Sequence, residues 1–190
     1  MSIRVEHISY IYGKGSPFEK TALDDVDLTI EKGEFIGIIG HTGSGKSTLI
    51  QHLNGLIHPT CGKVTIDGVD LAEKSKAAVA KRHSVGMVFQ YPEHQLFEET
   101  VAKDIAFGPM NLGCDEEEAG KRVKSAMKFA GLDYDTFAGR SPFRLSGGQQ
   151  RRVAIAGVIA IHPDFLVLDE PSGGLDPIGR REVFSRIQSW

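Results

Sequence analysis

Apolar and polar residues alternate along the first part of the chain. Apolar side chains recur at Ile3 and Val5 and again from Ile8 to Tyr12, and a second alternating run covers Leu23–Ile30. A period of two residues is typical of strands with one buried face. The segment between the runs, Gly13–Lys20, carries the Gly and Pro residues of a loop. The pattern therefore predicts a pair of antiparallel strands at the N-terminus.

Short apolar runs predict further strands at Phe35–Ile39 and Val85–Phe89. Phe165–Leu168 is wholly apolar, which is typical of a buried strand of a parallel sheet. A turn at His58–Gly62 leads to another expected strand at Lys63–Ile66. Strands of this kind separated by helical segments predict an α/β fold with a mixed or parallel sheet.

In other parts of the chain, apolar residues recur with the spacing of a helix. Lys46–Ile57 places apolar residues on one side, and Glu116–Ala130 does the same before Gly131, a residue suited to a helix C-cap. The residue pattern from Gln90 to about Arg144 is mostly typical of helices, which predicts a helical subdomain inserted into the α/β core. Ser146 is expected to cap a helix that runs to about Ile161. Asp176-Pro177 is expected to begin a last helix. The apolar residues expected on one side of the first helix are Leu49, Ile50, Leu53 and Leu56.

Bulk properties narrow the class of protein. The 190 residues are 41% hydrophobic, enough for one core and a small appended subdomain. The net charge of −3 argues against a nucleic-acid partner, because broad capture of nucleic acid needs a concentrated basic face. Cys61 and Cys114 lie far apart, as expected of reduced thiols in a cytosolic protein. No apolar run approaches the about 20 residues that span a bilayer, and no signal-peptide pattern is present.

A glycine loop follows the strand predicted at Phe35–Ile39 and precedes the helix predicted from Lys46. The segment Gly40-His-Thr-Gly-Ser-Gly-Lys46-Ser47 fits the P-loop pattern in full. Glycines let the backbone N–H groups turn toward phosphates, and the helix N-terminus adds positive potential. Lys46 would reach the β- and γ-phosphates of ATP, and Ser47 would ligate Mg²⁺. The predicted nucleotide-binding residues of this segment are Gly40, His41, Thr42, Gly43, Ser44, Gly45, Lys46, Ser47 and Thr48.

Two carboxylates end the apolar strand at Phe165–Leu168. Asp169 stands where a P-loop enzyme holds Mg²⁺. Glu170 comes next, points differently, and can polarise a water for attack on the γ-phosphate. The adjacent pair favours a hydrolase over a protein that only binds nucleotide.

The segment Leu145-Ser-Gly-Gly-Gln149 lies between the P-loop and these carboxylates. With this order and spacing the whole chain resembles the ATP-binding cassette (ABC) family of P-loop NTPases. The resemblance implies that this signature contacts the γ-phosphate bound by an opposite subunit, a role that suits a helix N-terminus. The predicted signature residues are Ser146, Gly147, Gly148 and Gln149.

The resemblance assigns three further positions. Gln90, after the strand predicted at Val85–Phe89, is similar to the glutamine that contacts Mg²⁺ and the attacking water. Tyr12 is similar to the aromatic residue that stacks on adenine, with Tyr10 as the competing candidate. Asp176, in Ser172-Gly-Gly-Leu-Asp176, is similar to the D-loop aspartate that crosses between subunits.

Several segments resemble the ATPases of energy-coupling factor (ECF) transporters, and within them the second, A-prime type. They include Tyr12-Gly-Lys-Gly-Ser-Pro-Phe-Glu-Lys20 and Phe89-Gln-Tyr-Pro-Glu-His-Gln-Leu-Phe97. This resemblance implies an ATPase that energises import of vitamins or transition-metal ions at the cytoplasmic face of the cell membrane. It implies a second ATPase subunit, in a heterodimer or alternatively a homodimer, together with a transmembrane coupling protein and a substrate-capturing membrane protein. Tyr91, Leu96 and Phe97 would receive the coupling protein, with core packing as the alternative for each.

A competing function is that of a soluble ABC ATPase of translation or DNA maintenance. Tandem cassettes or a long coiled coil would mark that class, and the sequence has neither. An inert regulatory cassette is disfavoured because every catalytic position in view carries the family's residue.

The predicted organisation is a single nucleotide-binding domain over residues 1–190. Its core comprises residues 1–90 and 145–190, and its helical subdomain about 91–144. The resemblance puts the family's switch histidine beyond Trp190, and no histidine from His41 to His162 is placed to substitute for it. We therefore expect a C-terminally incomplete domain with weak or no hydrolysis by the chain alone.

Overall fold

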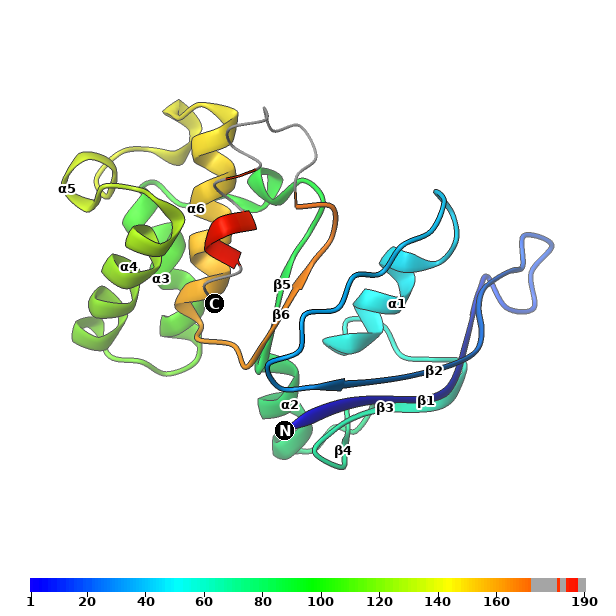
Figure 1. Ribbon diagram of the computed structural model, residues 1–190. Helices are drawn as coiled ribbons and strands as arrows, with labels where there is room; N and C mark the ends of the chain where they lie inside the picture. The colour runs from blue at the N-terminus through cyan, green and yellow to red at the C-terminus, as the bar shows by residue number, and fades with distance from the viewer. Residues whose placement is uncertain (172–180, 182–183, 188–190) are drawn as a thin grey trace. The chain divides into compact units, whose positions relative to one another are not determined.

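A computed structural model describes residues 1–171, 181 and 184–187 of the chain (Figure 1). The chain forms two compact units, Met1–Val85 and Gly86–Trp190. The predicted helix from Asp176 and the D-loop residue Asp176 lie outside the described residues.

A four-stranded sheet forms the first unit, in the order β2-β1-β3-β4. The long strand β1 pairs antiparallel with β2 on one side and with β3 on the other. Alternate residues of β1, namely Ile3 and Val5, are buried, as the period of two predicts. The antiparallel N-terminal pair is therefore confirmed. The strands are β1 Ser2–Tyr12, β2 Lys20–Glu31, β3 Cys61–Ile66 and β4 Val69–Asp70.

Bulges interrupt the pairing in the middle of β1 and β2. The register shifts between Val5 and Ile8, and His7 and Asp25 adopt positive φ angles of 50° and 47°. Gly62 of β3 lies against this bulge with φ 78°, and a Cβ there would collide with the carbonyls of Glu6 and His7. The bulge therefore requires a glycine on the neighbouring strand.

Two helices belong to the first unit, and the first is shorter than predicted. Helix α1 covers Lys46–Leu53 and buries Ile50 and Leu53, as predicted. The prediction that it runs to Ile57 is wrong, because Gly55 adopts a left-handed φ of 70° and turns the chain. Leu56 consequently is 56% exposed instead of joining the buried side. Helix α2, Lys76–His83, begins at the N-cap Ser75 and buries Ala78.

The strand predicted at Phe35–Ile39 is absent from the structure. Residues 35–39 have no strand assignment, and Phe35 and Ile39 are 72% and 94% exposed. A strand exists only through hydrogen bonds to a neighbour. The apolar run gives the composition of a buried strand, but it does not supply the partner, and the four-stranded sheet pairs its strands without this segment.

The second unit contains a pair of strands and most of the helices. The predicted strands are confirmed: β5 covers Val85–Val88 and pairs with β6, Phe165–Leu168. The helical character predicted between Gln90 and Arg144 is also confirmed. The elements are η1 Pro92–Gln95, α3 Val101–Asn111, α4 Glu116–Ala130, α5 Tyr134–Phe137, η2 Pro142–Arg144 and α6 Gly147–Ala160.

Helices α3, α4 and α6 pack on one another and enclose the core of this unit (Figure 1). Their buried side chains include Ile105, Met127 and Val153. Helix α4 ends at the left-handed Gly131 (φ 71°), as predicted. None of the helices within the described residues has both the length and the apolar character required to cross a membrane.

Candidate functional site

The predicted P-loop lies in the first unit, directly before α1. Gly43 and Gly45 adopt φ angles of 82° and 92°, which residues with a side chain rarely adopt. A Cβ on Gly45 would also lie 2.5 Å from the carbonyl oxygen of Ala22 on β2. Gly45 is the N-cap residue of α1, and no side chain caps that helix end. The loop therefore places an uncapped helix N-terminus, with its positive potential, at the protein surface.

Lys46 folds back over this loop. Its Nζ donates to the carbonyl oxygens of Gly40 at 2.9 Å and of His41 at 3.0 Å. The ammonium group is thus held above the loop by the loop's own backbone. Ser47 is exposed beside it, whereas Thr48 is buried. The remaining loop residues His41, Thr42 and Ser44 are exposed as well.

Tyr12 and Tyr10 have different surroundings. Tyr12 is 44% exposed, and its hydroxyl is 3.1 Å from the Oγ1 of Thr48 in α1. Tyr10 packs its ring edge-on against Tyr12 and against buried His52, at centroid distances of 4.8 and 5.0 Å. Burial lowers the pKa of His52, so this neighbour is neutral at physiological pH. The exposed ring of Tyr12, at the edge of the P-loop helix, is the better placed of the two to stack on a base.

The second group of predicted residues follows the β5–β6 pair in the second unit. Gln90 comes just after β5, and Asp169 and Glu170 follow β6; the Asp169 amide donates to the Val88 carbonyl at 2.9 Å. The Gln90 Nε2 donates to the Glu170 Oε2 at 2.7 Å. These two residues are 80 positions apart in the sequence. The structure therefore brings together an amide and a carboxylate that the sequence suggested separately.

Arg151 is a residue of this group that the sequence did not reveal. Its side chain is buried, and its Nη2 donates to the carbonyl oxygens of Gln90 and Glu170, each at 3.1 Å. The sequence signal was an arginine four residues before Ile155, on a side of α6 that is buried. Arginines are common on solvated helix faces, so this signal does not identify a contact by itself.

The signature residues form the N-terminus of α6. Ser146 is the N-cap. Its hydroxyl oxygen accepts from the backbone N–H of Gln149, and the side-chain oxygen of Gln149 accepts from the backbone N–H of Ser146. This reciprocal pair is a capping box, and the prediction of Ser146 as a helix cap is confirmed. Gly147 and Gly148 are exposed, and a Cβ on either would meet nothing within 4 Å. The first turn of α6 is therefore open at the surface of this unit.

The three residues expected to receive a coupling protein separate into two kinds. Tyr91 and Phe97 are exposed by 53% and 56%. Phe97 stacks edge-on against Phe107, which is also exposed. Leu96 instead is buried in the helical core, so core packing accounts for it.

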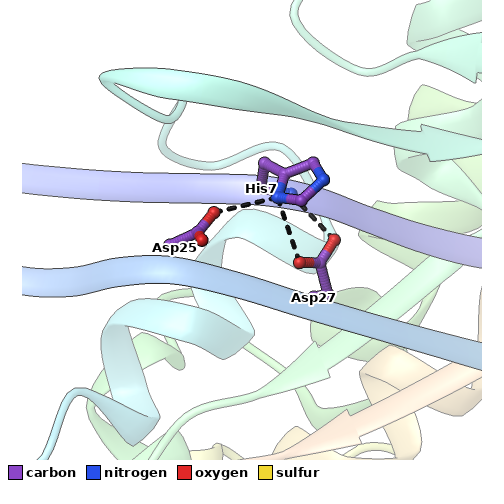
Figure 2. A group of neighbouring side chains, drawn as sticks. All are labelled: His7, Asp25 and Asp27. Atoms are coloured by element: carbon purple, nitrogen blue, oxygen red, sulfur yellow. Dashed lines mark hydrogen bonds and ion pairs between the residues drawn. The ribbon is translucent and has the colours of Figure 1, made fainter.

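His7 and two aspartates form a polar group on the first unit, at the bulge of β1 and β2. Figure 2 shows the His7 ring between the carboxylates of Asp25 and Asp27. The His7 Nδ1 is 2.9 Å from Asp25 and 3.2 Å from Asp27. The hydrogen bond to Asp25 and the charge of Asp27 raise the pKa of His7. All three side chains are exposed, and no predicted site residue belongs to the group.

Comparisons with known sequences point to one family. A family model described as ABC transporter matches residues 23–173. The chain is 58% identical over 188 residues to the energy-coupling factor transporter ATP-binding protein EcfA2 of Clostridium tetani and 60% identical to that of Clostridium acetobutylicum. It covers 99% of its own length in both alignments, and 65% and 66% of theirs. The chain thus spans about 65% of the length of these curated relatives.

Solved structures give the same fold. The structure of cbiO1 from Clostridium perfringens, part of the ABC transporter complex cbiONQ, matches with a TM-score of 0.84 and 38% identity over 98% of this chain and 72% of that chain. The ATP-binding cassette MJ0796, in a dimeric post-hydrolysis state bound to ADP and Pi, matches with a TM-score of 0.84 and 31% identity, covering 97% of this chain and 81% of that chain. The predicted α/β cassette fold is confirmed.

Proposed function

Because this chain belongs to the ABC transporter family, we propose that it is the ATP-binding and ATP-hydrolysing subunit of an ECF-type importer. The importer would carry vitamins or transition-metal ions, selected by a different polypeptide. The similarity to the ATP-binding proteins of energy-coupling factor transporters supports this proposal. The observation within this chain that carries it is the hydrogen bond between Gln90 and Glu170, because an amide beside a carboxylate would suit the orientation and deprotonation of an attacking water.

The P-loop is suited to the phosphates of ATP. Phosphate oxygens bind well at a helix N-terminus that has no side-chain cap, as at α1. Lys46 lies over the loop and would move its ammonium from the Gly40 and His41 carbonyls to the β- and γ-phosphates. Residues 40–48 form the proposed nucleotide-binding segment, and Tyr12 would stack on the adenine.

The residues assigned to Mg²⁺ fit that ion chemically. Ser47, Gln90 and Asp169 offer hydroxyl, amide and carboxylate oxygens, the ligands that Mg²⁺ prefers. Bound by these residues, Mg²⁺ would supply positive charge that offsets the charge of the phosphates. Glu170 is exposed and would accept a proton from the attacking water, while Gln90 orients it.

The open N-terminus of α6 implies a partner. Residues 146–149 would contact the nucleotide of a second ATPase subunit, in a heterodimer or alternatively a homodimer, with Asp176 crossing between the subunits. The dimeric form of the similar cassette MJ0796 supports this arrangement. The core would comprise residues 1–90 and 145–190.

Exposed aromatic residues support the proposal that the chain binds membrane proteins. Tyr91 and Phe97, within the helical subdomain of about residues 91–144, would contact a transmembrane coupling protein. That protein would act with a substrate-capturing membrane protein. The chain itself would then lie at the cytoplasmic face of the membrane through protein contacts.

Substitution of Glu170 tests the proposal. In the full-length protein assembled with its partners, Glu170→Gln keeps the size and the contact to Gln90 but removes the base. We expect ATP binding to persist while turnover falls by about a hundredfold or more. Lys46→Ala is the matched comparison, since it should weaken ATP binding itself. ATP hydrolysis by Glu170→Gln at the wild-type rate would show that the base is misassigned.

A further inference from the structure

A single guanidinium group joins the backbones of Gln90 and Glu170. Arg151 is only 3% exposed, and its Nη2 donates to both carbonyl oxygens at 3.1 Å. The side chains of the same two residues meet at 2.7 Å. These hydrogen bonds link Gln90, Glu170 and Arg151 to one another in a ring. They thereby join three segments of the second unit: the end of β5, the end of β6 and the first part of α6.

Two physical features show that this contact constrains the pair. A buried guanidinium is costly unless it is hydrogen-bonded, and its planar donors require acceptors in fixed positions. Glu170 has a φ of 47°, a left-handed conformation that is uncommon for a residue with a side chain. Such a conformation persists only where the surroundings hold it. The bond from Arg151 to the Glu170 carbonyl provides that hold next to the carboxylate.

We infer that Arg151 is a positioning residue for ATP hydrolysis: it fixes the main chains at Gln90 and Glu170 so that their side chains remain paired. This inference rests on the proposed function. Arg151 touches neither nucleotide nor water in this role and acts only through the other two residues. Loss of its contacts would let the carboxylate move, and displacements of about 1 Å at a reacting group can lower rates by about a hundredfold.

The test uses Arg151→Gln and Arg151→Lys in the full-length protein assembled with its partner ATPase. We expect Arg151→Gln to lower kcat by about ten- to a hundredfold, while affinity for a fluorescent ATP analogue changes by less than about threefold. Arg151→Lys should recover part of kcat, because an ammonium can still donate to a carbonyl. Arg122→Gln is the matched control. Arg122 also donates to a main-chain carbonyl, that of Ile161, but lies on α4, so kcat should be unchanged.

A double substitution separates positioning from general loss of structure. If Arg151 acts through Glu170, then Arg151→Gln should cost little further turnover in a Glu170→Gln background. Equal losses in both backgrounds, a wild-type kcat in Arg151→Gln, or parallel losses of kcat, affinity and melting temperature would each overturn the inference. Failure of the wild-type assembly to bind and hydrolyse ATP would instead overturn the proposed function, and the inference with it.

Discussion

The P-loop in the first unit is held by hydrogen bonds within its own segment, whereas Gln90 and Glu170 in the second unit are held by a side chain from a distant part of the sequence. Lys46 bonds to carbonyls five and six residues away. Arg151 bonds to carbonyls 61 and 19 residues away. The geometry of the loop therefore depends on its glycines, while that of the Gln90–Glu170 pair depends on the packing of α6 in the helical core. Substitutions in the helical core of the second unit should therefore disturb the Gln90–Glu170 pair and leave the P-loop unchanged.

The largest expected effect comes from Met127→Ala in the helical core. Met127 of α4 is fully buried in the helical core. Its truncation should lower the free energy of unfolding by about 2–5 kcal/mol, through lost burial and the cavity left behind. Urea denaturation measures the loss, and amide hydrogen exchange should rise in residues 86–171 more than in the P-loop. Met110→Ala is the control, because Met110 is 43% exposed and its truncation should change little. An equal rise of amide exchange in both units would contradict the expectation that the P-loop is independent of the helical core.

Tyr12→Ala tests the proposed nucleotide-binding residues of the first unit. Loss of a stacking platform should weaken ATP binding by about 1–3 kcal/mol, which is roughly five- to 150-fold. Isothermal titration with ATP measures the change in the full-length protein. Tyr12→Phe is the matched control, since it keeps the ring and loses only the contact to Thr48. Wild-type affinity in Tyr12→Ala would remove Tyr12 from the site and return attention to Tyr10.

Ser146→Ala should have a smaller effect, on stability. It removes the capping box of α6, a loss of about 1 kcal/mol. Chemical denaturation should detect it, with Ser141→Ala as the control, because the Ser141 side chain does not cap the short helix η2. An equal effect of the two substitutions would mean that the capping box contributes nothing measurable.

The smallest effect concerns His7 on the exposed face of the first unit. Because its pKa is raised in the folded protein, its contribution to stability is fully present below the ordinary histidine pKa and is lost as pH rises through the folded pKa. NMR titration should show a His7 pKa above that of a model peptide, and Asp25→Asn should lower it, since the hydrogen bond to Asp25 is the main cause. An unchanged titration curve in that variant would exclude Asp25 as the cause.

The sequence predicted elements well where the signal is local. The strands β1 and β2, the helix Glu116–Ala130 with Gly131 as its cap, and the capped start of α6 all follow from short-range pattern and capping chemistry. The prediction failed at Phe35–Ile39 and at the end of α1. A strand depends on a partner elsewhere in the chain, and a single left-handed glycine ended the helix although the apolar spacing continued.

The sequence by itself indicated the family and predicted the P-loop and the signature, because each of these motifs is a continuous segment of adjacent residues. Only the tertiary structure decided that Gln90 and Glu170 share a hydrogen bond, that Tyr12 is the exposed one of two aromatic candidates, and that Leu96 belongs to the core. It also revealed Arg151. These outcomes depend on which distant segments pack together, and local propensity carries no information about that.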